Sequence, residues 1–133
     1  MRKLFWLLGL SLALFGCGFK KDYLVIGNSR LRVEVRADEL GRQQGLSGRN
    51  KLEEDQGMLF IFDKKARHKF WMKGMKFPLD FVWIDGDEVV GITEKVGVEE
   101  MDIRPNQAVD KVLEVNSGWV ERQGIKVGDK IRL

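Results

Sequence analysis

Short stretches of alternating or apolar residues recur along the chain, and they predict β-strands. Residues 31–36 alternate apolar and charged side chains, which is typical of a strand that is buried on one face. Residues 58–62 and 70–72 are wholly apolar runs, so we expect strands that are buried more completely. Residues 109–115 give a further strand, and a turn over 124–129 leads into a last strand at the C-terminus.

Residues 77–84 form the most apolar segment that follows the first twenty residues. In a strand, successive side chains point to opposite faces. One face then carries Phe77, Leu79, Phe81 and Trp83, and the other carries Val82 and Ile84. A segment that is apolar on both faces is normally buried on both. The dipeptide Asp85-Gly86 follows, which indicates a hairpin with residues 88–93 as the returning strand.

Two short helices are predicted from their end signals. Asp38 can cap a helix that ends before Gly45, and Ser117 can cap one that runs to Gln123 and ends at Gly124. Many short strands with two brief helices favour a mainly β (α+β) fold. We expect a compact, closed or nearly closed β-barrel of short, mostly antiparallel strands.

The first residues predict export. Arg2 and Lys3 precede an apolar run over residues 4–15, which is the pattern of a signal peptide over residues 1–16. The run is shorter than the ~20 apolar residues that a membrane-spanning helix needs. Its end, Leu-Phe-Gly-Cys, resembles a bacterial lipobox, which implies cleavage after Gly16 and a lipid on Cys17. The lone cysteine fits this interpretation, because a free thiol is unusual in an oxidising compartment.

These observations predict three segments: a signal peptide over 1–16, a lipid-anchored tether over 17–22 and a single β-barrel domain over 23–133. The protein is then an extracytoplasmic lipoprotein of the cell envelope, held to the membrane through Cys17. Removal of residues 1–16 takes away Arg2 and Lys3, so the 23 Lys and Arg residues become 21, against 20 Asp and Glu. A chain so close to neutral gives nucleic-acid binding no support.

Six ordered segments make the chain recognisable. Together they resemble the domain-of-unknown-function family 192 (DUF192), from about residue 31 to the C-terminus. The resemblance implies a compact, mainly β fold in an often exported family, and it supplies no mechanism. Gly74 and Met75 depart from the family pattern, which commonly has asparagine and threonine there. The segments are GLSGR (45–49), GMLFIF (57–62), FWMK (70–73), FPLDFVWID (77–85), VLEVNSG (112–118) and GIKVGD (124–129).

The candidate ligand-binding residues are charged side chains within apolar runs and an aromatic residue near a cation. Asp80 and Glu114 each interrupt an apolar run, and a carboxyl group there must be paired or lie at a rim. Trp71 and Lys73 share a strand face, which suits a ligand groove and equally a lysine that merely covers apolar surface. Together with Arg49, these residues can converge on one polar pocket. A structural ion pair or a turn-capping carboxylate is the alternative for Asp80, and Glu114 is similar.

A metal site is a second interpretation. The thioethers of Met72 and Met75 and the imidazole of His68 are ligands that suit copper(I). A turn at Gly74 is needed to bring the two methionines together, because they lie on opposite faces of a continuous strand. Methionines also fill cores, which is the alternative explanation.

The sequence favours a binding module for an envelope component or partner protein. The first alternative is a copper(I)-binding envelope protein. The second is a hydrolase with a carboxylate pair, for which Asp80 and Glu114 are the candidates. Other catalytic classes lack their parts: one histidine cannot build a multi-histidine zinc site, and no serine stands in a nucleophile-elbow setting. No phosphate-binding glycine loop is present, and we expect no cofactor.

Overall fold

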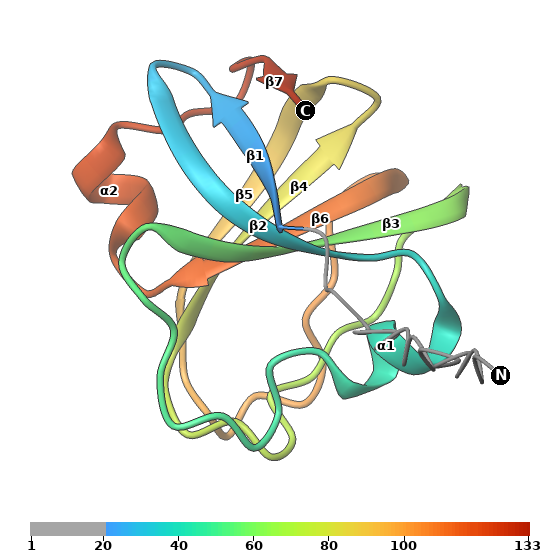
Figure 1. Cartoon of the computed structure of the whole chain (residues 1–133). Coiled ribbons are helices and arrows are strands. Elements are labelled where there is room, and N and C mark those ends of the chain that lie inside the picture. The colour runs from blue at the N-terminus through green and yellow to red at the C-terminus, as the bar shows by residue number, and fades with distance from the viewer. Residues whose placement is uncertain (1–20) are drawn as a thin grey trace, which may run out of the picture.

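The computed structural model describes residues 21–133, and it contains one strongly curled sheet of seven strands (Figure 1). The strand order across the sheet is β5-β4-β6-β3-β2-β1-β7. All pairings are antiparallel except that of β2 with β3, which the helix α1 connects. The elements are β1 (Lys21–Ile26), β2 (Ser29–Arg36), α1 (Glu39–Gln44), β3 (Gln56–Ala66), β4 (Leu79–Asp85), β5 (Glu88–Val96), β6 (Val109–Asn116), α2 (Trp119–Gln123) and β7 (Ile131–Arg132).

The sheet curls until its two edges meet. The amide of Val89 on β5 donates to the carbonyl of Asp129 (2.9 Å), and the amide of Gly128 donates back to Val89 (2.8 Å). The amide of Ile131 on β7 donates to Asp87 (2.7 Å). These bonds remove part of the exposed edge that an open sheet would leave. The predicted mainly β, nearly closed barrel with two short helices is therefore confirmed.

Buried apolar residues form two clusters, one on each face of the central strands. The first fills the concave interior and includes Val82 and Ile84 of β4 together with Trp119 and Val120 of α2. The second lies on the outer face, where Leu79, Phe81 and Trp83 are buried. The predicted division of β4 between two faces is thus confirmed, and both faces are covered.

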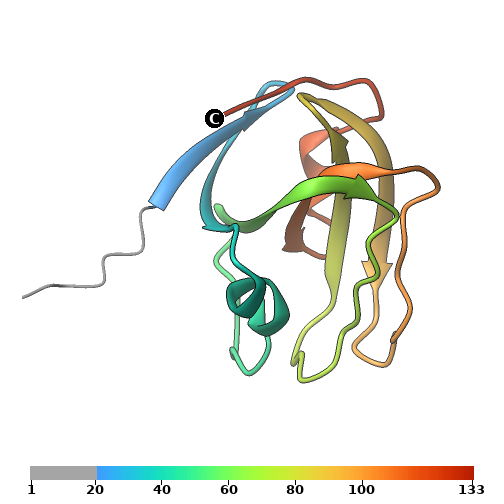
Figure 2. The ribbon, with the colours of Figure 1, turned by 90° about the vertical axis from the view of Figure 1, so that its right-hand side faces the viewer.

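Connections between strands cover the outer cluster. The segments that follow α1, β3 and β5 run next to one another below the strands, and α1 lies on the same side (Figures 1 and 2). They contribute Leu46, Leu52, Met72 and Ile103 to the outer cluster. This cover is what builds the candidate site.

Three local predictions are corrected by the structure. Residues 70–72 are not a strand: Phe70 makes only an isolated bridge to Ile103, and the chain turns at Gly74, whose φ is +78°. An apolar run does not distinguish a strand from a covering segment. The first strand begins at Lys21 and so takes in the last two residues of the predicted tether, which pair with β2. The remainder of that tether, Cys17 and the predicted signal peptide lie outside the described residues.

The third correction concerns α2. Its N-cap is Gly118, in the left-handed region, and the residue makes no side-chain capping bond. Asp80 of β4 takes the role predicted for Ser117: its Oδ2 accepts the amide of Val120 at 3.1 Å. The predicted cap of α1 is confirmed, because Asp38 accepts the amide of Gly41 (2.7 Å) and Gly45 ends the helix.

Asp80 is fully buried and also fastens β5. Its Oδ1 accepts the amide of Lys95 (2.8 Å). Lys95 has a φ of +54° and lies where the register between β4 and β5 shifts, so it belongs to a β-bulge. One carboxyl group therefore accepts a backbone amide in a bulge and another at the start of a helix.

None of the helices among residues 21–133 is long and apolar enough to cross a membrane.

We predict that Asp80→Ala destabilises the protein strongly. The substitution leaves the buried amide of Val120 and the partly buried amide of Lys95 without their acceptor, and a buried amide without a partner costs about 1–3 kcal/mol. We expect the free energy of unfolding, measured by chemical denaturation, to fall by roughly 2–5 kcal/mol. The exposed carboxyl group of Asp102 serves as the control, and Asp102→Ala should change the free energy of unfolding by less than about 0.5 kcal/mol. Equal effects of the two variants would contradict the role of Asp80.

Candidate functional site

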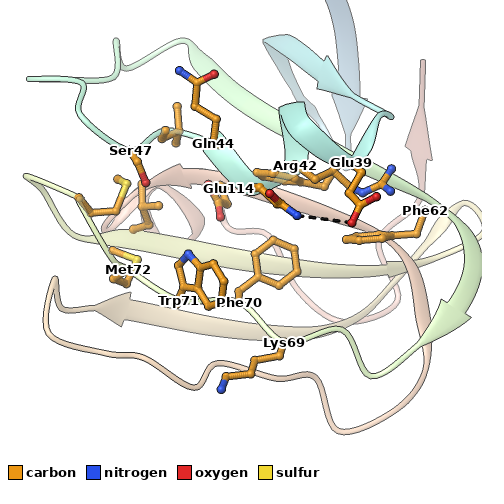
Figure 3. Close-up of a pocket in the computed structure, with 16 residues that line it drawn as sticks. Glu39, Arg42, Gln44, Ser47, Phe62, Lys69, Phe70, Trp71, Met72 and Glu114 are labelled. Atoms are coloured by element: carbon orange, nitrogen blue, oxygen red, sulfur yellow. Dashed lines mark hydrogen bonds between the residues drawn. The ribbon is translucent and has the colours of Figure 1, made fainter.

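A pocket of about 310 Å³ opens on the outer face, between α1 and the segment 69–75 (Figure 3). Its floor is formed by side chains of the sheet, and its two walls are the helix and the covering segment. Eight of its sixteen lining residues carry aromatic, aliphatic or thioether side chains, the groups that usually line sites for small molecules. The lining residues are Glu39, Arg42, Gln43, Gln44, Gly45, Leu46, Ser47, Phe60, Phe62, Lys69, Phe70, Trp71, Met72, Met75, Leu79 and Glu114.

Glu114 is the ionisable residue at the floor of the pocket. It lies in β6 directly opposite Met58 of β3 and Phe81 of β4, and both of these neighbours are fully buried. Glu114 itself is only 5% exposed. Among residues 21–133, no hydrogen bond or ion pair is found for its carboxyl group. In the pocket it lies between the side chains of α1 and the segment that carries Phe70 and Trp71 (Figure 3).

Burial changes the acid chemistry of Glu114. Loss of hydration disfavours the charged form of a carboxyl group, and it raises the pKa of Glu114 from 4.5 to about 8. The group is therefore mostly protonated at neutral pH. A neutral carboxylic acid has one O–H to donate and also accepts. Among the side chains of the sheet that form the floor, which are otherwise apolar, Glu114 thus supplies a strong hydrogen-bond donor.

The two walls of the pocket are joined at one end. The hydroxyl of Ser47 donates to the carbonyl of Lys73 (2.7 Å), and the amide of Gly48 donates to the carbonyl of Gly74 (2.9 Å). A Cβ at position 74 would lie 3.3 Å from that of Ser47, and the residue has a positive φ. Glycine at position 74 therefore allows the covering segment to approach the loop after α1.

The basic residue on α1 is already engaged. The Arg42 guanidinium donates to the carbonyls of Ala37 and Ile61, and it lies 4.9 Å from the ring centroid of Phe62. The ring of His68 stacks on the same phenylalanine, with 3.6 Å between centroids. These contacts fix one corner of the pocket.

The structure brings together some of the predicted site residues. Trp71, which is 50% exposed, lines the pocket with Glu114. Met72 and Met75 line it too, because the amide of Met75 donates to the carbonyl of Met72 (3.0 Å) in the turn at Gly74. The turn that the copper interpretation required is therefore present.

Other predicted residues lie elsewhere, so the expected convergence on one polar pocket is wrong. Arg49 makes two bonds to Glu34 of β2 (2.8 and 2.7 Å), and the bond to Glu34 raises the pKa of this guanidinium. Lys73 is exposed and does not line the pocket. Asp80 faces the barrel interior and α2.

The predicted pair of Asp80 and Glu114 does not form. Asp80 is opposite Val115, while Glu114 is opposite Phe81. Because successive residues of a strand face opposite sides, the two carboxyl groups lie on opposite faces of the sheet. The prediction of His68 as a metal ligand beside the methionines is also not supported, since its ring stacks on Phe62 and its Nε2 contacts the carbonyl of Lys64 (3.0 Å). No cluster of three or more His, Cys, Asp or Glu side chains in residues 21–133 is arranged to hold a metal.

Sequence reasoning missed the wall supplied by α1. Glu39, Arg42 and Gln43 belong to a helix that buries none of its residues, so nothing in its pattern distinguishes it from a solvated surface helix. Phe60 and Phe62 were assigned only to a strand. Their spacing by two does place them on one face of β3, and this signal points toward the pocket once the face is known.

We predict that Glu114 makes folding stability depend on pH. Its pKa is raised in the folded state, so the folded protein retains the proton that the unfolded chain releases above about 4.5. Stability therefore falls as pH rises from about 5 to about 8, by at most roughly 5 kcal/mol if the whole shift is realised. Glu114→Gln should flatten this part of the stability profile in denaturation measurements. The exposed residue Glu99 provides the control, because Glu99→Gln should keep the wild-type slope; the same slope in Glu114→Gln would contradict the assignment.

Comparison with known proteins identifies the family to which this chain belongs. The model of DUF192, described as an uncharacterized ACR, matches residues 23–133. A solved protein from Sinorhizobium meliloti 1021, described as a "putative transcription regulator", is 31% identical, with 88% of this chain and 96% of that chain covered and a TM-score of 0.83. A protein of unknown function from Novosphingobium aromaticivorans DSM 12444 is 26% identical, with 84% of each chain covered and a TM-score of 0.79. A search of curated proteins found no match. Since the family model spans nearly all of the described residues, the chain belongs to the DUF192 family.

Proposed function

We propose that this protein is a binding module that takes a small, largely apolar molecule into the pocket between α1 and the segment 69–75. The observation that carries the proposal is a buried carboxyl group, Glu114, at the floor of an aromatic-lined pocket. A pocket with an apolar lining and a few polar groups is the usual form of a ligand site. Trp71 at the rim supplies a large apolar surface that binding would cover.

The role in transcription suggested for the Sinorhizobium meliloti protein is another possibility, and we do not extend it to this chain. The net charge here is only +3, and a nucleic-acid site needs a concentrated basic surface. Several basic side chains are also engaged in ion pairs, among them Arg32 with Asp55 (3.0 Å) and Arg49 with Glu34 (2.7 Å).

The membrane anchor belongs to the same proposal. The first seventeen residues have the pattern of a lipoprotein signal, and Cys17 precedes the first strand, which begins at Lys21. So short a separation would hold the domain close to the membrane surface, on the extracytoplasmic side. Radiolabelled palmitate should enter the wild-type protein and not Cys17→Ala; equal labelling would refute the anchor and leave the pocket proposal untouched.

Binding can be tested with butylbenzene as an apolar probe of the full-length protein. We expect a saturable shift of the Trp71 indole N–H signal in NMR spectra, with a Kd of about 1 mM. This Kd corresponds to about 4 kcal/mol, which lies below the ceiling of about 1.5 kcal/mol per non-hydrogen atom for small ligands. Gln43→Trp places a bulky ring at the pocket mouth and should weaken binding about tenfold. Leu40→Trp adds the same ring on the exposed side of α1, where Leu40 is 79% exposed, and should not. No saturable shift in the wild type would refute the proposal.

Copper(I) binding is a second candidate, and one observation favours it. Met72 and Met75 line the same pocket as Trp71, and the amide of Met75 bonds the carbonyl of Met72 in the turn between them. Thioether sulfur is a soft ligand that suits copper(I). We leave His68 out of this ligand set, because its ring stacks on Phe62.

Silver(I), a stand-in for copper(I), tests the second candidate. If the site exists, one equivalent of silver(I) should shift the Trp71 indole signal in the wild type. Met75→Leu keeps the side-chain volume and removes the sulfur, so the shift should disappear. Met101→Leu is the matched control, since Met101 is 49% exposed and does not line the pocket. A response that survives in Met75→Leu, or none in the wild type, rules the site out.

A further inference from the structure

We infer that the pocket selects a neutral molecule with a carbonyl-type oxygen, which accepts a hydrogen bond from the carboxylic acid of Glu114. This inference rests on the proposed binding function and names the chemical class of its ligand. It follows from the apolar side chains that surround Glu114 and from the contacts that the other charged groups of the pocket already make.

The immediate surroundings of Glu114 are apolar on every sheet strand that packs against it. Met58 of β3 and Phe81 of β4 flank it at the same level of the sheet, Phe60 and Leu79 belong to the floor, and Met72 belongs to the covering segment. Such neighbours cannot satisfy a carboxyl group. A buried polar group without a partner is costly, so a ligand that supplies the missing partner gains affinity at this one point.

The charged groups around the pocket lie on its walls, and their balance is positive. Arg42 and Glu39 come from α1, and Lys69 comes from the covering segment. Arg42 is engaged with two carbonyls and with Phe62, and Glu39 accepts a bond from Gln43 (3.4 Å). Among the described residues, none of them is found in an ion pair with Glu114. Two cations against one carboxylate at the entrance disfavour the approach of a cationic ligand.

The protonation of Glu114 agrees with a neutral partner. Burial holds its pKa at about 8, so at pH 7 the acid form predominates about tenfold. A neutral acceptor uses the state that is already present. A cation must first expel the proton, and at pH 7 this reduces its affinity about tenfold. A neutral carboxylic acid in an apolar site is an effective hydrogen-bond donor, which other proteins exploit.

Three probes of one skeleton test this class of ligand on the full-length protein. Benzylacetone carries a ketone, its reductive-amination product carries an ammonium group in place of the ketone oxygen, and butylbenzene carries neither. Binding is followed by the Trp71 indole N–H signal, and the ionisation of Glu114 by its side-chain carboxyl ¹³C signal. At pH 6 we expect the ketone to bind more tightly than the amine and to raise the pKa of Glu114. Its affinity should fall as pH rises above 8.

Two variants separate a hydrogen bond from mere burial. Glu114→Leu removes the donor, so the ratio of ketone to hydrocarbon affinity should fall about tenfold, the effect of one buried hydrogen bond. Glu114→Gln keeps an N–H donor and should retain the preference for the ketone, without its dependence on pH. Both variants remove a costly buried acid, so both are expected to fold.

Each other outcome contradicts the inference. Tighter binding of the amine, with a lowered pKa of Glu114, would show that the pocket selects cations. An unchanged affinity ratio in Glu114→Leu would show that the ketone does not contact this acid. In both cases butylbenzene still binds and the proposed function stands. If neither butylbenzene nor benzylacetone binds, the proposed function fails as well, and the inference falls with it.

Discussion

The carboxyl group of Asp80 is the interaction on which the arrangement of this sheet depends. It bonds the amide of Lys95 in the bulge of β5 and the amide of Val120 at the start of α2, and so joins two elements that make no regular ladder with each other. The bonds hold Asp80 toward the barrel interior. Its neighbours in β4, Leu79 and Phe81, must then face outward. Through the pairing of Phe81 with Glu114, the same constraint turns Glu114 toward the pocket.

An outer face built in this way requires a cover. Leu79, Phe81 and Trp83 would expose a large apolar surface, and such surfaces on a single domain are normally hidden or used. The long connections supply most of the cover, with Leu46, Met72 and Ile103 packed onto it. The pocket lies where the cover is incomplete, between α1 and Trp71 (Figure 3). Packing and the proposed binding are thus two uses of one apolar surface.

The sequence predicted those features that depend on neighbouring residues. The two faces of β4 follow from alternation, and the limits of α1 follow from Asp38 and Gly45. The sequence did not predict features that depend on pairing between distant segments. Asp80 and Glu114 look alike in the sequence, since each is a carboxyl group in an apolar run; only the register of β4 against β6 shows that they face opposite ways. The cap of α2 likewise comes from a residue forty positions away, whereas the local pattern indicates Ser117.

Alternation along the central strands also bears on how such proteins can diverge. In β6, Leu113 and Val115 pack in the barrel interior, while the residue between them faces the pocket. The side chains that fill the barrel and those that line the pocket are therefore interleaved in sequence yet separated by the thickness of the sheet. Substitutions on the outer side can accumulate without repacking the interior. Relatives with the same barrel can accordingly recognise different molecules, and a shared fold within the family does not require a shared ligand.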